Sequence, residues 1–298
     1  MADAVVLVSG GAAVSPFTDP DHAAGRGLAA GNTLTALRRH LLDRGLRVFT
    51  APARLGVGEV RADAGWQGFD DVPVVLPAEM TINSVGTIDD AGVALAAFLR
   101  RLAAEHAVTS VDLVGHSMGG LFARAAIREL GDEDPRAERL ITLGTPWDGA
   151  VLGDAVAGEI TDADAHGDPS TTTILLQARA YAAANSEGAA EQVSHRYLRE
   201  WNRAQTGVLD GIPVTVIGAG YFAAAVEPAR LWPHDGLVSL RSGRADDIPA
   251  EVLPEARRHA FPDDVHSIFF ADAFGLPWER ALTWDPAVFA VVDEALGI

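Results

Sequence analysis

The chain has 298 residues, 48% of them hydrophobic, so it is long enough to bury a large core. Its formal net charge of −18 repels phosphate backbones and anionic lipid surfaces, and we therefore expect no nucleic-acid partner. The sequence contains no cysteine and no lysine, which excludes disulfides, thiol nucleophiles, cysteine metal sites and lysine Schiff bases.

The N-terminal part predicts the start of an alternation between strands and helices. Residues 4–8 are a continuous apolar run typical of a buried strand, and a Ser-Gly-Gly turn follows them. Residues 32–44 carry leucines at helical spacing, and residues 46–50 form the next apolar strand. Residues 51–86 are rich in proline and glycine, so we expect them to run over a surface.

The short, acidic N-terminus has no cationic segment before its apolar run, which is unlike a signal peptide. No window of the sequence approaches the length of a membrane span. We therefore expect a soluble protein without a transmembrane segment, cytoplasmic rather than secreted. A secreted precursor trimmed for expression would give the same sequence.

Two helices have clear terminal signals. Thr87 and Asp90 resemble a capping box with Asp in place of Glu, and apolar residues at helical spacing follow them. The last helix is predicted from Asp285 as the N-cap, Pro286 at the first helical position and Gly297 after the last turn.

The pattern as a whole predicts the α/β class. Further apolar strands are expected at residues 111–114, 140–143 and 213–218, and strands separated by helices imply a mostly parallel sheet covered on both faces. We expect a single domain over residues 1–298.

The alternation stops in residues 149–210, where an alanine-rich helical segment predicts an inserted cap or lid. A longer crossover helix pair packed on the sheet is the alternative. The helices expected within it cover residues 174–184 and 193–201.

The most informative motif is Gly115-His116-Ser117-Met118-Gly119-Gly120, which lies between a predicted strand and a predicted helix. A serine at such a sharp turn is pushed out of the backbone with its hydroxyl exposed. Flanking glycines are needed because side chains there would collide with the neighbouring strand or helix. We therefore predict that Ser117 is a nucleophile, with a structural glycine-rich turn as the alternative.

A serine hydroxyl is a poor nucleophile, so the site needs a histidine base and an acid that fixes the histidine tautomer. Chain order and loop position favour Asp235 as the acid and His266 as the base. Asp148 and His259 are the alternatives, and either preferred residue could be an ordinary loop residue. His116, at the variable position of the turn, is expected to point away from the site.

Together these motifs resemble α/β-hydrolases of the bacterial lipase and esterase type. The segments that carry the resemblance are Gly115–Gly120, Leu143–Pro146, Asp235–Val238 and His266. The resemblance implies the α/β-hydrolase fold and cleavage of a carboxylic ester through an acyl-enzyme on a Ser-His-Asp triad. An acyltransferase or thioesterase would use the same acyl-enzyme, and a catalytically silent binding protein is the alternative from another class.

The resemblance also implies an oxyanion hole formed by the backbone N–H groups of Met118 and Gly11. Here the chain departs from the family, because Ser9 stands where these enzymes usually carry a histidine before the glycine.

Aromatic residues in loops near the predicted site could line an apolar acyl pocket, although aromatic residues are core residues at least as often. These residues are Phe17, Trp147, Tyr221, Phe222 and Trp232. We expect a small-molecule or lipid-like ester as the substrate and no cofactor. No metal site is expected, because the histidines are dispersed and Asp162, Asp164 and Asp168 fall short of a calcium loop.

Overall fold

The computed structural model describes residues 2–15, 34–62, 72–184, 189–224 and 231–298. Its centre is a six-stranded sheet with the order β10-β9-β8-β7-β1-β2, in which every neighbouring pair is parallel. The strands are β1 (Ala4–Val8), β2 (Val48–Thr50), β7 (Ser110–His116), β8 (Arg136–Leu143), β9 (Val214–Ala219) and β10 (Ala256–Phe261). The prediction of a mostly parallel sheet is confirmed.

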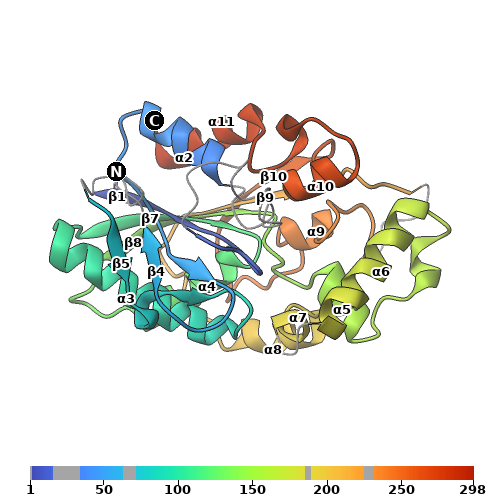
Figure 1. Cartoon of the computed structure of the whole chain (residues 1–298), viewed down its shortest axis with the longest axis horizontal. Coiled ribbons are helices and arrows are strands. Elements are labelled where there is room, and N and C mark those ends of the chain that lie inside the picture. Colours follow the sequence, from blue (N-terminus) through green and yellow to red (C-terminus); the bar gives the residue numbers. More distant parts are fainter. Residues whose placement is uncertain (1, 16–33, 63–71, 185–188, 225–230) are drawn as a thin grey trace.

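Helices cover both faces of this sheet. On one side lie α3 (Ile88–His106) and α4 (Gly119–Glu129), and on the other lie α2 (Thr35–Asp43) and α11 (Pro286–Leu296) (Figure 1). Alternate side chains of β1 pack against the helices on opposite faces of the sheet. Val6 and Val8 belong to the hydrophobic cluster around α3 and α4, whereas Val5 and Leu7 belong to the cluster around α2 and α11.

The predicted helix termini are confirmed in atomic detail. The Thr87 hydroxyl accepts a hydrogen bond from the Asp90 backbone N–H at 3.0 Å and donates one to its carboxylate at 2.6 Å. Asp285 accepts from the N–H of Ala287 at 2.8 Å, and Gly297 ends α11 with φ +78°. Both helices therefore begin where their side chains satisfy backbone groups that the helix leaves unpaired.

Residues 51–86 contain more regular structure than the sequence predicts. They include the pairs β3 (Ala53–Arg54) with β6 (Ile82–Asn83) and β4 (Val60–Ala62) with β5 (Val74–Leu76), and the short helix η2 (Ala78–Met80). Strands of two or three residues are too short to show an alternating pattern, so the sequence gives no signal for them. Strand β8 begins at Arg136 rather than at residue 140. The apolar pattern does not predict its first four residues, because three of them are charged and none is buried.

The segment predicted as a cap is largely helical. Its elements are α5 (Val151–Val156), η3 (Asp162–Ala165), α6 (Pro169–Ala184), α7 (Ala189–Gln192) and α8 (His195–Arg203). In Figure 1, α5 and α6 lie at one end of the molecule and α7 and α8 lie along its lower side, away from α2 and α11. Side chains of α5 and α6 join a third hydrophobic cluster together with Phe222 and Trp232, which follow β9. The role of this segment as a cap stays a prediction.

The chain after β9 completes the molecule with short helices and α11. The short helices are α9 (Leu240–Gly243), α10 (Ile268–Ala273) and η4 (Trp278–Arg280). Among the helices in the described ranges, none combines the length and the apolar character that crossing a bilayer requires.

Candidate active site

Ser117 lies in the sharp turn between β7 and α4 with φ +55°, in the left-handed region that residues other than glycine rarely adopt. The surrounding packing requires the glycines of the motif. A Cβ atom on Gly119 would lie 2.1 Å from the carbonyl oxygen of Val8, and one on Gly115 would lie 2.5 Å from the nitrogen of Gly120. The strand and the helix therefore meet too closely for any side chain at these two positions.

Two hydrogen bonds from the end of β8 hold this strained turn. The Ser117 N–H donates to the carbonyl of Leu143 at 2.9 Å, and the Thr145 hydroxyl donates to the carbonyl of Ser117 at 2.8 Å. The Ser117 side chain stays half buried at the carboxyl edge of the sheet. The segment at the end of β8 thus holds both the N–H and the carbonyl of Ser117, which restricts the positions open to the serine hydroxyl.

His266 and Asp235 form a buried pair near the same edge. The Nδ1 atom of His266 lies 2.8 Å from Oδ2 of Asp235, and the two side chains are 2% and 1% exposed. The other carboxylate oxygen, Oδ1, accepts hydrogen bonds from the N–H groups of Leu237 at 2.9 Å and Val238 at 2.7 Å. These bonds fix the carboxylate, and a carboxylate at Nδ1 favours the tautomer in which Nε2 is the free base.

His116, the residue before the serine, contacts the histidine of this pair. Its Nε2 atom lies 2.9 Å from the carbonyl oxygen of His266, and the two ring centroids are 4.7 Å apart. The expectation that His116 points away from the site is wrong. Complete burial and the charge of His266 hold the pKa of His116 well below its ordinary value, so its ring is neutral and donates through Nε2.

Gly144 brings the end of β8 against this pair. It has φ +58°, and a Cβ atom there would lie 3.0 Å from Nδ1 of His266 and 3.2 Å from Oδ2 of Asp235. Gly144 follows Leu143, whose carbonyl accepts the hydrogen bond from Ser117. Ser117, His266 and Asp235 are therefore connected through neighbouring backbone at one edge of the sheet.

The imidazole nitrogen that would face a substrate is left without a partner. Within the described ranges, Nε2 of His266 is buried and forms no hydrogen bond, so the structure shows none to the Ser117 hydroxyl. Catalytic hydrogen bonds are often long in ligand-free sites and shorten when substrate binds. A buried imidazole nitrogen without a hydrogen-bond partner is able to accept a proton, which is what a general base requires.

The loop after β1 lies directly on the turn. A Cβ atom on Gly10 would lie 2.5 Å from Cβ of Ser117 and 3.0 Å from the nitrogen of Met118, and one on Gly11 would lie 2.8 Å from the Met118 sulfur. The N–H groups of Met118 and Gly11 donate no hydrogen bond to another described residue. Gly10 thus allows the close approach, and two backbone donors remain for a ligand oxygen.

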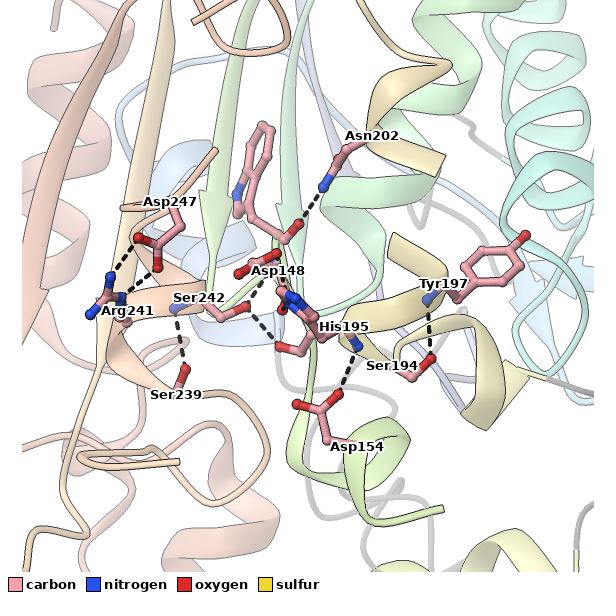
Figure 2. A network of polar contacts seen from close by, with 12 residues as sticks. Asp148, Asp154, Ser194, His195, Tyr197, Asn202, Ser239, Arg241, Ser242 and Asp247 are labelled. Atoms are coloured by element: carbon pink, nitrogen blue, oxygen red, sulfur yellow. Dashed lines mark hydrogen bonds and ion pairs between the residues drawn. The ribbon is translucent and has the colours of Figure 1, made fainter. Parts of the chain in front are cut away.

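The alternative acid and the alternative base that the sequence suggests, Asp148 and His259, lie elsewhere. Asp148 pairs with His195, with Oδ1 to Nδ1 at 3.0 Å, and these side chains are 22% and 26% exposed (Figure 2). His259 lies in β10 opposite Ile217. The structure thus brings Asp235, rather than Asp148, into contact with His266. His195 lies in the segment predicted as a cap, and no local sequence signal predicts its aspartate partner.

Three of the aromatic residues predicted for an acyl pocket are buried in the packing of the protein. They are Trp147, Phe222 and Trp232. The Trp147 indole donates to the hydroxyl of Thr142 at 3.1 Å, and its ring lies 4.4 Å from the guanidinium carbon of Arg124. Tyr221 is 37% exposed. Phe17 lies outside the described residues, and the acyl pocket stays a prediction.

His234 connects the segment 149–210 to the loop of Asp235. Its Nε2 atom lies 3.0 Å from the hydroxyl of Thr171 in α6, and its Nδ1 accepts from the N–H of Gly236 at 3.1 Å. The rings of Phe222 and Trp232 pack against it, with centroids 5.1 Å and 4.9 Å away. Burial lowers the pKa of His234 to about 4, so this contact uses a neutral imidazole.

A cavity of about 290 Å³ lies beside the loop that contains Asp235. Polar residues from three segments line it: Asp148, Asp154, His195, Ser239, Arg241, Ser242 and Asp247. Of the predicted aromatic pocket residues that the structure describes, none is among its lining residues. In the part of the chain that the structure describes, no group of three or more His, Asp and Glu residues is arranged to hold a metal ion.

The comparisons with solved structures agree with this architecture. A lipase from Bacillus licheniformis, BlEst2 in its mature form, is 15% identical, with 99% of this chain and 91% of that chain covered and a TM-score of 0.52. The lipase of Staphylococcus hyicus is 13% identical, with 99% and 95% covered and a TM-score of 0.51. The lin2722 gene product of Listeria innocua is 15% identical, with 98% and 93% covered and a TM-score of 0.50.

The chain has the α/β-hydrolase fold. At these identities the likeness to solved structures extends to the fold alone. A family model described as a PGAP1-like alpha/beta domain matches residues 79–163, the part of the α/β-hydrolase fold that contains the Ser117 turn. Among curated proteins, none matches the sequence.

Proposed function

We propose that this protein hydrolyses carboxylic esters, with Ser117 as the nucleophile, His266 as the general base and Asp235 as the acid of a catalytic triad. The observation that supports this most strongly is the buried contact of 2.8 Å between His266 Nδ1 and Asp235 Oδ2, at the sheet edge that carries the Ser117 turn. The α/β-hydrolase fold, shared with proteins named lipases, adds support for a hydrolase.

In this proposal the reaction follows from the residues present. His266 Nε2 takes the proton of the Ser117 hydroxyl as the oxygen attacks the acyl carbonyl, and Asp235 stabilises the imidazolium that forms. The N–H groups of Met118 and Gly11 hold the oxyanion, and His266 then returns the proton to the leaving alcohol. Water activated by the same histidine hydrolyses the acyl-enzyme.

An acyltransferase or a thioesterase would use the same acyl-enzyme, and the contacts described here are equally compatible with both. Ester hydrolysis is the simpler proposal because it needs no acceptor other than water. Product analysis in the presence of added alcohols distinguishes ester hydrolysis from acyl transfer.

The direct test is labelling with a fluorophosphonate probe. We expect the wild-type protein to be labelled at Ser117 and the Ser117→Ala variant to remain unlabelled. Ser267→Ala is the matched control, because Ser267 is a buried serine next to His266 whose hydroxyl has no described partner. A folded wild type that is not labelled would contradict the proposal and favour a catalytically silent binding protein.

A series of p-nitrophenyl esters then tests the predicted preference for a hydrophobic acyl group. Turnover should change with chain length if an apolar pocket receives the acyl chain. Equal turnover from acetate to long chains would remove the pocket from the proposal without removing the triad.

A further inference from the structure

The loop after β1 carries Gly11, whose N–H is one of the two proposed oxyanion donors, and this glycine lies between the Ser117 turn and Ser84. A Cβ atom on Gly11 would lie 2.8 Å from the Met118 sulfur on one side and 3.8 Å from the carbonyl oxygen of Ser84 on the other. Ser84 is completely buried and takes no part in the reaction proposed above. Its contacts with the loop therefore need an explanation of their own.

Ser84 binds the loop at two successive residues. Its carbonyl oxygen accepts a hydrogen bond from the Ala12 N–H at 3.0 Å, and its hydroxyl donates to the carbonyl of Ala13 at 2.7 Å. The hydroxyl also lies 3.0 Å from the carbonyl of Arg54, which accepts from the Ser84 N–H at 2.9 Å. A hydroxyl has only one proton to donate, so the shorter contact, to Ala13, is its main hydrogen bond.

The residue between these two bonds has a strained backbone. Ala12 has φ +55°, in the left-handed region that residues other than glycine rarely adopt. Such a conformation persists only where the surrounding structure holds it. The Ala12 N–H belongs to the peptide group that follows Gly11, so Ser84 fixes the direction of that peptide group next to the proposed donor.

The carbonyl of Ala13 depends on the Ser84 hydroxyl. Ala13 is 1% exposed, and no other described residue donates a hydrogen bond to its carbonyl. A buried carbonyl without a donor is costly, so removal of the hydroxyl favours a shift of the loop that exposes this oxygen to water.

The small sheet of β3 and β6 holds Ser84 itself. Ser84 follows β6 directly, and its N–H donates to Arg54 at the end of β3. The same strand holds the far end of the loop, because the Ser15 N–H donates to the carbonyl of Ala53 at 2.8 Å. The loop from Gly10 to Ser15 is thus attached to this small sheet at its end, and Ser84 attaches it beside Gly11.

We propose that Ser84 is a positioning residue for the oxyanion hole, which holds the Gly11 N–H where the negative oxygen of the tetrahedral intermediate develops. This inference rests on the proposed hydrolase function and adds to it a residue outside the triad and the two donor residues. Oxyanion donors are effective because they are in place before the charge develops, and loss of one costs about 100- to 1,000-fold in kcat. A donor that is displaced but still present should cost less.

The first test is Ser84→Ala, assayed on a p-nitrophenyl ester. We expect kcat to fall about 10- to 100-fold with KM little changed, because the Gly11 N–H matters most when the oxyanion forms. Inhibition by a trifluoromethyl ketone, which forms a tetrahedral oxyanion adduct with a nucleophilic serine, should weaken by a similar factor. Wild-type values of kcat and of this inhibition constant in Ser84→Ala would overturn the proposal.

Thr81→Val is the matched control for a purely structural effect. Thr81 is 4% exposed, and its hydroxyl donates to the carbonyl of Pro77 at 2.9 Å rather than to the loop after β1. Both variants remove a buried hydroxyl that binds a backbone carbonyl, so both should lower the Tm, but only Ser84→Ala should lower kcat. An equal fall of kcat in the two variants would show that Ser84 contributes to stability alone.

A second variant keeps a donor at the same place. A thiol is a weaker donor than a hydroxyl, so Ser84→Cys should have a kcat between those of Ser84→Ala and the wild type. The chain contains no other cysteine, so the new thiol cannot form a disulfide within it. If Ser84→Ala does not fold, Ser84→Cys is compared with Thr81→Val instead, and equal kcat values in those two variants would contradict the proposal.

Fluorophosphonate labelling of the wild type separates this inference from the proposed function. A wild type that is labelled at Ser117 and active, together with full kcat in Ser84→Ala, would overturn the role of Ser84 and leave the hydrolase proposal intact. A folded wild type that is neither labelled nor active would overturn both.

Discussion

The molecule contains two His–Asp pairs near the carboxyl edge of its sheet, and they differ in almost everything except the contact itself. In both, Nδ1 of a histidine meets a carboxylate, at 2.8 Å for His266 and Asp235 and at 3.0 Å for His195 and Asp148. The first pair is 2% and 1% exposed, whereas the second is 26% and 22% exposed. Solvent therefore screens the second pair and hardly reaches the first.

Their surroundings differ as well. Asp235 receives two backbone N–H groups on the oxygen that does not meet the histidine, and the carbonyl of His266 is bonded by His116. His195 lies in a cavity wall, and its Nδ1 also lies 3.1 Å from the backbone carbonyl oxygen of Asp148. A short His–Asp distance is thus a weak indicator of catalysis, and burial with fixed orientation beside a nucleophile is a stronger one.

Matched substitutions in the two pairs test this distinction. Asp235→Asn removes the charge that stabilises the imidazolium and permits the wrong tautomer, so we expect kcat to fall about 10⁴-fold. Asp148→Asn should leave kcat within about twofold. Both variants are assayed on one p-nitrophenyl ester, with circular dichroism to verify folding. A larger loss in Asp148→Asn would reverse the roles that we assign to the pairs.

The pH dependence of stability gives the second prediction, because the loop of the buried pair contains Asp264. Burial, reinforced by the charge and hydrogen bond of Asp285, raises the pKa of Asp264 from 3.8 to about 8, against the opposing charge of Arg280. The folded protein therefore binds more protons than the unfolded chain between these values. Its free energy of unfolding should fall as the pH rises from about 4 to 8.

Asp264→Asn keeps a donor for Asp285 but cannot ionise, so its stability curve should lack this fall. After allowance for solvent screening, we expect the variant to gain about 1–3 kcal/mol over the wild type between pH 5 and pH 9, measured by urea unfolding. Asp263→Asn is the control, because its side chain is 77% exposed. Parallel curves for the wild type and Asp264→Asn would show that Asp264 is ionised throughout.

Local signals and distant contacts were predictable to different degrees. The Ser117 turn and the caps at Thr87 and Asp285 depend on residues close in sequence, so local motifs predict them directly. The fold class follows from the alternation of strands and helices. Asp235 and His266 are predicted only through chain order in a resembling family, since two residues 31 positions apart carry no pairwise signal.

The contacts that sequence reasoning missed all join distant segments. His195 reaches Asp148 across 47 residues, and His116 reaches His266 across 150. A histidine at a variable position carries no sign of its partner, because the partner is set by how the loops pack. Such contacts can be identified only from the folded structure, in which these distant segments lie side by side.

A smaller loss of activity than for Asp235→Asn is predicted for His116, which contacts the buried pair. His116→Phe keeps a buried ring but removes the N–H that binds the carbonyl of His266. A displacement of His266 by a fraction of an ångström should lower kcat on the order of 10-fold, with KM little changed. His116→Gln retains a donor and should recover most of this loss. If both variants match the wild type in kcat, the bond to His116 contributes nothing to the orientation of His266, and burial and the two backbone N–H groups on Asp235 remain as the differences between the two pairs.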